Sequence, residues 1–336
     1  WPGTAYVVRR DLDGDARRAA GPRPWRLAAA GAAGAGRHVF PHGVAVARGS
    51  HARGVGQAAT RGHRPGRVPP NRHRFTVYAG SPGHPERVAR NVNHLELGAA
   101  RGDDYELVIE PPDDACYVIA RQYFHDPGAE SSATMHIEVL DGPDPVVADD
   151  DAIAARWRAA AGFVRAMTKP PAARPQPSYA STVVNCIGEP AGWREDEGGG
   201  RGTPDQTYAL GRFDLDADHA LVMHVRVPAC AYASAVLWNR FGQSIDSRVH
   251  RSVLNDRQLV TDADGSARVV VAHRDPGVPN WLDTGGRRQG TVFWRFLLAQ
   301  ERPEPIRTDV VPLTGLSKAT RANPLIAPVG TAQPSP

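Results

Sequence analysis

Two apolar runs in the second half of the chain constrain its fold more than any other feature. Residues 267–272 (ARVVVA) and 291–298 (TVFWRFLL) are rich in β-branched and aromatic residues and are bounded by turn residues. This pattern predicts β-strands, and we expect both to be central strands of their sheets. The turn sequence DADG at 262–265 predicts that 258–261 pairs with 267–272 as a hairpin, because its Gly is able to adopt positive φ.

The segment between these strands has a different character. Residues 275–286 (DPGVPNWLDTGG) hold two prolines and three glycines, which exclude regular structure. They also include Trp281, whose large apolar ring is too costly to leave in water. We therefore expect a loop that is fixed in place by its Trp.

An earlier part of the chain resembles the same arrangement. Aligning 118–123 with 292–297 places Arg121 over Arg295. The separation of about 170 residues is too long for a solenoid repeat. We interpret the two regions as two related β units or as two halves of one sandwich; the alternative is that any two antiparallel sheets share such turns and valines. The other predicted strands are 105–110, 117–123, 135–140, 207–210, 220–227, 235–238 and 306–313.

One amphipathic helix is predicted between the two β units. Three consecutive Asp residues at 149–151 offer N-cap acceptors and negative charge to a helix start. Apolar residues then follow at three- and four-residue spacing, which predicts a helix that packs its apolar stripe onto a β unit and buries Trp157. Pro170 and Pro171 end it. The residues of the stripe are Ile153, Trp157, Ala160, Val164 and Met167.

The N-terminal part of the chain is basic and poor in large apolar residues. Residues 16–85 contain twelve Arg and no Asp or Glu, whereas the whole chain of 336 residues has a net charge of +4, so the remainder is acidic. A solvated, irregular segment is the usual outcome of such a composition. A translated neighbouring reading frame is the alternative. Aromatic residues for stacking on bases are nearly absent, so we expect no nucleic-acid partner.

These observations divide the chain. We expect a basic, irregular or misread segment, a first β unit, a bridging helix, a Pro/Gly-rich linker and loop, a second β domain and a disordered tail, at 1–73, 74–148, 149–169, 170–202, 203–316 and 317–336. The sequence contains no transmembrane segment. It begins without Met, so an upstream signal peptide or domain is left open.

The reactive side chains do not form a recognisable catalytic or metal-binding motif. The three cysteines are widely spaced and odd in number, which excludes a zinc knuckle or a disulfide framework and favours buried thiols. The histidines lack metal-ligand spacing, so no metal or other cofactor is expected. Ser244 lacks the second Gly of a nucleophile elbow. The residues considered are Cys116, Cys186, Cys230, His219, His224, His250 and His273.

Several stretches together resemble a bacterial family called domain of unknown function 1214. They are GTPDQTYALGRF, VLWNRF, the phrase HRDPGVPNWLDT and the helix DDAIAARWRAAAGFVRAMT. The resemblance is most specific from Thr203 to Val311 and weaker from Phe75 to Thr168. It implies a mainly β, jelly-roll-like antiparallel sandwich in a bacterial protein, for which we slightly favour a cytoplasmic location. It implies no agreed activity, and residues 1–73 depart from it.

Large side chains on and beside the predicted core strands form the candidate site. Arg295 lies among apolar neighbours on a central strand and needs a partner. Asp283 is one such partner, in which case the contact is structural. The other interpretation makes Arg295 an anchor for an anionic or polyhydroxylated ligand, with Trp rings beside it. The candidate residues are Trp238, Asn239, His250, Trp281, Asp283 and Arg295.

Two functions from different classes follow. The first is a β-sandwich protein that binds a small molecule, a glycan or another carbohydrate, or an envelope lipid through the Trp/Arg-lined face. The alternative is a hydrolase or lyase in which His250 or His273 acts with Asp283 as an acid–base pair in the same pocket. The absence of a nucleophile or metal motif favours the first. The sequence does not indicate the ligand, whether the protein is an enzyme, or its oligomeric state.

Overall fold

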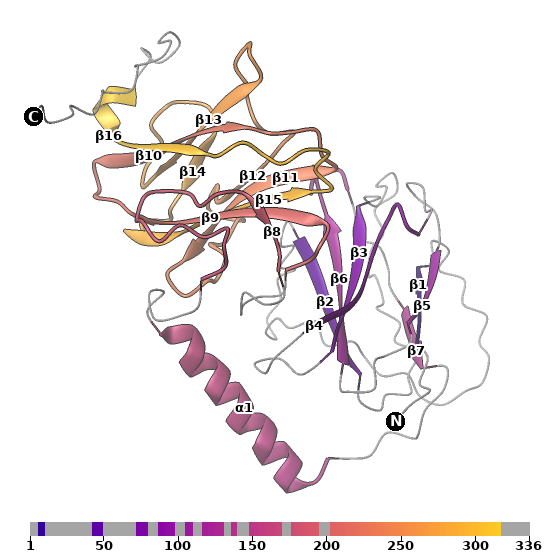
Figure 1. Cartoon of the computed structure of the whole chain (residues 1–336). Helices are drawn as coiled ribbons and strands as arrows, with labels where there is room; N and C mark the ends of the chain where they lie inside the picture. The colour runs from indigo at the N-terminus through magenta and orange to yellow at the C-terminus, as the bar shows by residue number, and fades with distance from the viewer. Residues whose placement is uncertain are drawn as a thin grey trace, which may run out of the picture.

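A computed structural model describes the chain over 6–10, 42–49, 72–79, 87–97, 105–109, 116–130, 136–139, 148–169, 176–194 and 202–316. The fold is mainly β, as expected, with one long helix and predominantly antiparallel strand pairs (Figure 1). The strands of the first half are β1 (Tyr6–Arg10), β2 (His42–Gly49), β3 (His73–Ala79), β4 (Arg87–Asn93), β5 (Tyr105–Ile109), β6 (Cys116–Tyr123) and β7 (His136–Val139).

The second half follows α1 (Asp150–Thr168). Its strands are β8 (Ala191–Gly192), β9 (Gln206–Asp214), β10 (His219–Arg226), β11 (Tyr232–Asn239), β12 (Val253–Asn255), β13 (Ser266–Ala272), β14 (Trp281–Asp283), β15 (Gln289–Leu297) and β16 (Arg307–Pro312), before a final 3₁₀ turn, η3 (Leu313–Leu316).

The second half forms a β-sandwich. One sheet has the order β12-β11-β15-β9-β8 and the other has the order β14-β13-β10-β16. Their facing sides supply the main apolar core, in which Trp294 and Phe296 of β15 meet Met223 of β10 and Val269 of β13. Both β13 and β15 have a neighbour on each side, so the prediction of two central strands is confirmed.

A third sheet packs against one end of the outer face of the five-stranded sheet, and Tyr179 and Trp193 pack against Tyr208 and Phe293 on the same face. Its order is β2-β6-β3-β4. The ring of Tyr123 on β6 lies 5.4 Å from the ring of Tyr232 on β11. Gln206 on β9 donates a hydrogen bond to the Tyr123 hydroxyl, and Asn255 on β12 donates one to the His125 carbonyl. The inner face of the five-stranded sheet is therefore apolar, whereas its outer face makes polar contacts with the third sheet at one end.

The predicted hairpin is wrong, although its turn is correct. Gly265 has φ +80° and closes the turn with a hydrogen bond to the Asp262 carbonyl. Residues 258–261 nevertheless form no strand, and the partners of β13 are β10 and, in parallel, β14. The Asn280 side chain makes hydrogen bonds with both backbone groups of Val260 instead, so this segment is fixed by side-chain contacts.

The expectation of an irregular segment over 1–73 is wrong where the structure describes it. β1 is the central strand of a small sheet with the order β5-β1-β7. β2 pairs with β6 along eight residues, from His42 opposite Tyr123 to Gly49 opposite Cys116. Backbone pairing does not require large apolar side chains, which is why a composition argument failed to predict these strands.

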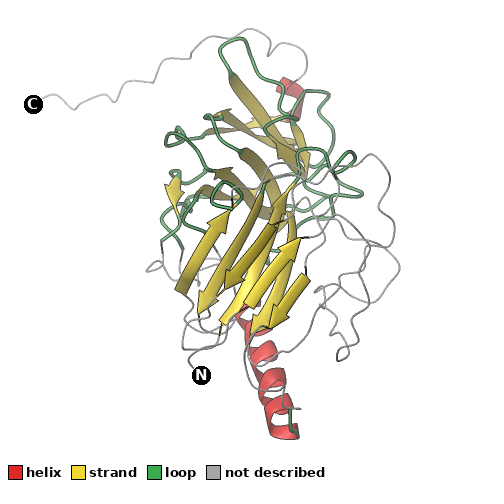
Figure 2. Cartoon of the chain, turned by 90° about the vertical axis from the view of Figure 1, so that its right-hand side faces the viewer, coloured by secondary structure: helices red, strands yellow, loops and turns green. Residues whose placement is uncertain are grey.

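The prediction that α1 packs its apolar stripe onto a β unit is also wrong. The helix begins as expected, because the Asp149 side chain accepts a hydrogen bond from the Ala152 N–H. It then extends away from the sheets (Figures 1 and 2), and Trp157 is 73% exposed. Ile153 and Val164 are exposed as well. Helical periodicity correctly predicted the element but not its surroundings.

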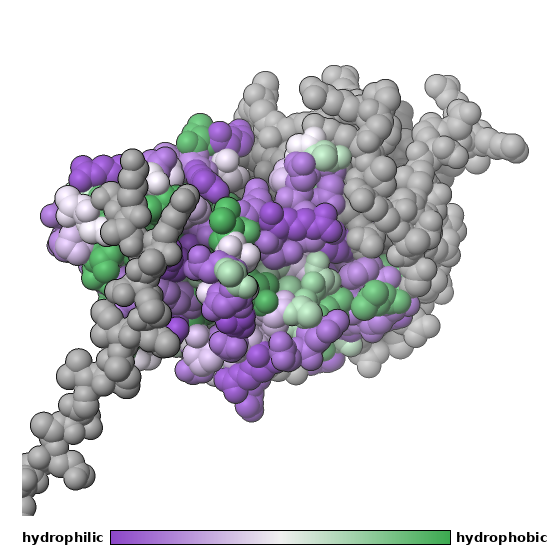
Figure 3. Space-filling model, turned by 90° about the horizontal axis from the view of Figure 1, so that it is seen from above, coloured by the Kyte–Doolittle hydropathy of each residue, from purple (hydrophilic) through white to green (hydrophobic). Residues whose placement is uncertain are grey.

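In the described part of the chain, no helix has the length and apolarity needed to cross a membrane. Seen from above, hydrophilic residues cover most of the described surface, with hydrophobic residues in small separate groups among them (Figure 3).

Two tryptophans provide a matched test of this fold. Trp294→Ala is expected to reduce the free energy of unfolding by about 3–5 kcal/mol, because its ring fills the sandwich core. Trp157→Ala is expected to change it by less than about 0.5 kcal/mol, as for other surface substitutions. Urea unfolding of the two variants checks this, and a loss above about 2 kcal/mol in Trp157→Ala would show that the helix packs against the protein.

Candidate functional site

The polar layer lies between the outer face of the five-stranded sheet and the sheet β2-β6-β3-β4. Alternation along β15 sends Trp294 and Phe296 into the sandwich core and Phe293 and Arg295 to the opposite face. Three arginines from three strands meet tyrosines there, Arg74 of β3, Arg121 of β6 and Arg295 of β15. We call this group, with Tyr78, Tyr123, Tyr208 and Tyr232, the Arg/Tyr layer.

Arg74 is fully buried and is held by the loop before β9. Its Nη2 lies 2.9 Å from an Asp205 carboxylate oxygen, and its Nη1 donates to the Thr203 hydroxyl. The guanidinium also lies over the ring of Tyr123, 5.6 Å from its centroid. Asn93 donates a further hydrogen bond of 3.3 Å to Asp205. This charge is therefore neutralised within the protein.

Arg121 is buried among hydroxyl groups. Its two terminal nitrogens donate to the Thr76 hydroxyl and the Tyr78 hydroxyl, each at 3.1 Å. Tyr78 in turn donates to the Gly202 carbonyl at 2.9 Å. Burial raises the pKa of Tyr78, and Arg121 opposes that shift. Tyr78 is thus a hydroxyl that both accepts from a guanidinium and donates to the backbone.

Arg295 differs from the other two arginines. Within the described residues its guanidinium makes no hydrogen bond and no ion pair, and its contact is with the face of the Phe293 ring, 5.0 Å from the centroid. Burial lowers the pKa of Arg295, while Tyr123, Tyr208 and Tyr232 act to raise it. Its Nε is buried without a hydrogen-bond partner in the described residues, although the side chain as a whole is only partly buried. Burying part of a guanidinium without an acceptor costs free energy.

The carboxylates near the Arg/Tyr layer already interact with other residues. Glu130 forms a 2.9 Å ion pair with Arg72. Asp256 accepts from the Ala233 N–H at 2.9 Å and lies 3.1 Å from Nε2 of His125. Burial acts to raise the pKa of Asp256, but these two hydrogen bonds outweigh it and lower the pKa. Neither group is available to neutralise Arg295.

The six residues predicted for the site do not come together. Trp281 packs with Val222 and Val270 on the outer face of the four-stranded sheet, and Leu282 fills the core. By alternation, Asp283 points to the same side of its strand as Trp281, the outer face of the four-stranded sheet. Arg295 points outward from the five-stranded sheet, on the other side of the sandwich. The predicted contact of Arg295 with Asp283 is therefore wrong, because the apolar core separates them.

Trp238 is the predicted residue that shares a neighbour with Arg295. Its ring stacks on Phe293 at 4.5 Å between centroids, and Phe293 carries Arg295 on its face. Asn239 has a structural role, since its side-chain oxygen accepts from the N–H groups of Phe241 and Gln243. A Trp/Arg-lined face is thus present on β11 and β15, with different partners from those expected.

The predicted acid–base pair exists at a separate place. Nδ1 of His250 lies 2.8 Å from an Asp283 carboxylate oxygen. His273 instead uses both ring nitrogens in contacts with the Thr284 hydroxyl and the Leu215 carbonyl, at 2.7 and 3.0 Å, which suits a structural role. The alternative function required this pair in the same pocket as Arg295, and the two lie on opposite faces of the sandwich.

Sequence reasoning missed the residues that complete the Arg/Tyr layer. Arg74 and Tyr123 come from strands of the first half, and Tyr208 and Tyr232 come from the second. One signal for the layer was visible, namely the alignment that placed Arg121 over Arg295, because both occupy central strands of facing sheets.

The cysteines and potential metal ligands form no reactive site where they are described. Burial raises the pKa of the Cys230 thiol to about 11, so it is a poor nucleophile at neutral pH. Cys230 and Cys186 are free thiols and only partly buried. In the parts of the chain that the structure describes, no group of three or more His, Cys, Asp or Glu side chains is arranged to hold a metal ion.

Comparisons with known proteins support the fold and leave the activity open. No family model and no curated protein matches this chain, so the resemblance to domain of unknown function 1214 stays a prediction. A crystal structure of an uncharacterised protein from Burkholderia cenocepacia is 26% identical, with a TM-score of 0.66 over 82% of this chain and 77% of that one. A protein of known structure from Vibrio parahaemolyticus is 13% identical, with a TM-score of 0.43 over 72% of this chain and 84% of that one.

The different environments of Arg74 and Arg295 predict different effects of substitution on stability. Arg74→Met is expected to reduce the free energy of unfolding by about 3–5 kcal/mol, because Asp205 loses its buried partner. Arg295→Met is expected to be neutral or stabilising, because it strands no carboxylate. Chemical denaturation of both variants checks this, and equal large losses would show that Arg295 is a structural residue.

His94 gives a pH-dependent prediction. Burial, together with Arg72 and Arg74, lowers the pKa of His94, so the folded protein favours the neutral ring. The unfolded chain binds the proton more readily, so this contribution to stability is present above about pH 6.5 and is lost as the pH falls below it. His94→Gln is expected to lose less stability than the wild type between pH 7.5 and pH 5.5 in denaturant titrations. Identical losses would contradict the assignment.

Proposed function

We propose that this protein binds a small anionic molecule in the Arg/Tyr layer. The carrying observation is the Arg295 guanidinium, which is placed between two sheets without an acceptor in the described residues. A guanidinium whose Nε is buried without an acceptor costs stability, and a ligand that supplies carboxylate, phosphate or sulfate oxygens would compensate it.

The surroundings of Arg295 support an anion with an apolar or aromatic body. Phe293 lies under the guanidinium, Trp238 stacks on Phe293 at 4.5 Å, and Tyr208 lies 5.4 Å from Phe293 between ring centroids. Aromatic walls with few, fixed polar groups are typical of small-molecule sites. Arg121, held rigidly by the Thr76 and Tyr78 hydroxyls, adds a second positive charge to the same layer.

This proposal narrows the sequence-based expectation. A small molecule, a glycan and an envelope lipid were all compatible with a Trp/Arg-lined face. A neutral glycan would leave the Arg295 charge without compensation, whereas an oxyanion neutralises it. The protein also stays a proposed member of the domain of unknown function 1214 family, whose name assigns no ligand.

The binding site is tested with anions matched to a neutral analogue. Benzoate or inorganic sulfate is expected to raise the melting temperature of the wild-type protein in a concentration-dependent manner, and benzyl alcohol is expected to have no effect. The shift should disappear in Arg295→Met. It should persist in the control Arg257→Met, because Arg257 is exposed and makes no ion pair with a described residue.

Three outcomes overturn the proposal. An equal shift in the wild type and in Arg295→Met would place the anion elsewhere. A shift produced equally by benzyl alcohol would show that charge is not recognised. No shift with any anion at millimolar concentration would leave the guanidinium without a ligand role.

A further inference from the structure

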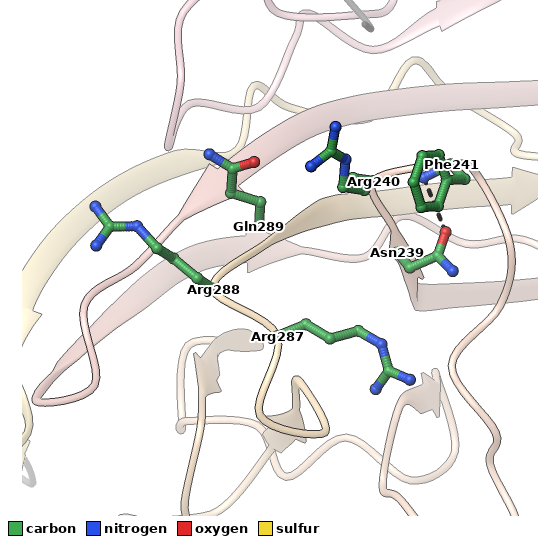
Figure 4. A pocket seen from close by; sticks show the side chains of 6 residues that line it. All are labelled: Asn239, Arg240, Phe241, Arg287, Arg288 and Gln289. Carbon is green, nitrogen blue, oxygen red and sulfur yellow. Dashed lines mark hydrogen bonds between the residues drawn. The ribbon is translucent and has the colours of Figure 1, made fainter. Parts of the chain in front are cut away.

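A second group of positive side chains lies at the far end of β11 and β15, away from the Arg/Tyr layer. A pocket of about 520 Å³ lies there. Figure 4 shows the side chains that line it, those of Asn239, Arg240, Phe241, Arg287, Arg288 and Gln289. It is formed where the turn after β11 meets the segment before β15, since Asn239 pairs with Gly290 at that end of the sheet.

The three arginines of this pocket are not equivalent. Arg288 is neutralised, with nitrogens 2.7 Å from both Asp214 and Asp216. Arg287 extends in the opposite direction (Figure 4) and donates to the Gly285 carbonyl at 3.1 Å. Arg240 lies over the Phe241 ring, 5.0 Å from its centroid. Neither Arg287 nor Arg240 forms an ion pair with any residue that the structure describes, so the pocket carries two uncompensated positive charges.

The pair of His250 and Asp283 adjoins Arg287. A Cβ atom placed on Gly285 would lie 2.5 Å from Nη1 of Arg287 and 3.1 Å from Nε2 of His250. The two nitrogens therefore lie close to each other and crowd this residue. Gly285 has φ +59°, so a side chain here is disfavoured by the backbone as well as by the available space.

The protonation pattern of His250 is fixed by its partner. One Asp283 oxygen accepts from the Gly285 N–H at 2.7 Å and the other lies 2.8 Å from Nδ1 of His250. An ionised carboxylate accepts hydrogen bonds only, so Nδ1 carries the proton. Nε2 then lies beside Gly285 with no hydrogen-bond partner in the described residues, so its lone pair is able to accept a hydrogen bond.

We infer that His250, Arg287 and Arg240 form a second anion-binding site that takes a phosphate monoester. The guanidinium groups of Arg240 and Arg287 line the pocket and can donate to phosphoryl oxygens, and the Nε2 lone pair of His250 beside Arg287 can accept from a phosphoryl O–H. Phe241 is 37% exposed at the pocket and offers a surface for the organic part of the ligand.

Phenyl phosphate is the probe for this site. Calorimetric titration of the full chain is expected to show binding that weakens at least about tenfold in Arg287→Gln and in His250→Gln, as loss of a charge-assisted hydrogen bond implies. Arg257→Gln is the matched control for an exposed Arg and should bind as the wild type does. Arg295→Met should also bind normally, which separates this site from the one in the Arg/Tyr layer.

Imidazole NMR gives a second measurement that does not depend on affinity alone. The ring signals of His250, identified by their loss in His250→Gln, are expected to shift when phenyl phosphate is added. Unchanged affinity in Arg287→Gln, no shift of the His250 signals, or no binding to the wild type would each overturn the inference. Arg287 is an exposed side chain, so its variant is expected to fold.

Discussion

The five-stranded sheet packs against another sheet on each face, and the rest of the structure depends on how these two contacts differ. One face supplies Trp294 and Phe296 to an apolar core closed by the four-stranded sheet. The other face supplies Tyr208 and Arg295 to a polar layer closed by β2-β6-β3-β4. Apolar burial stabilises the first contact in the usual way. The second contact depends on hydrogen bonds and ion pairs between polar side chains. A charged side chain that has no partner among the described residues of this contact, such as Arg295, is therefore a candidate for ligand binding.

This lack of a partner among the described residues is local. Arg74 is compensated by Asp205, and Arg72 by Glu130, each with a nitrogen–oxygen distance of 2.9 Å. The same layer therefore pairs its charges where pairing supports the fold. Arg295 is the exception, because its neighbours are phenol and phenyl rings. Stable proteins commonly tolerate such departures at binding sites, where a polar group is prepared for a ligand at some cost to stability.

The strands and the helix could be predicted from local sequence, whereas strand pairing and burial depend on residues that are far away in the sequence. The apolar runs at 267–272 and 291–298 predicted central strands because side-chain composition and alternation are local properties. The predicted pairing of 258–261 with 267–272 was wrong, because β13 pairs with β10 and β14 rather than with the residues just before its turn. The periodicity of α1 similarly predicted a helix but not the exposure of Trp157. Alternation along β15 correctly indicates that Arg295 points away from the apolar core. It could not predict the neighbouring sheet, which comes from residues about 170 positions earlier.

Anomalous diffraction from crystals of the full chain soaked in bromide tests the central claim most directly. Bromide is a small anion that reveals uncompensated positive charge independently of any particular ligand. The account predicts a bromide ion within hydrogen-bonding distance of the Arg295 guanidinium, between the two sheets, and none at Arg74, which Asp205 already neutralises. Bound bromide at Arg74 alone, or a protein carboxylate or carbonyl oxygen hydrogen-bonded to Arg295, would contradict it.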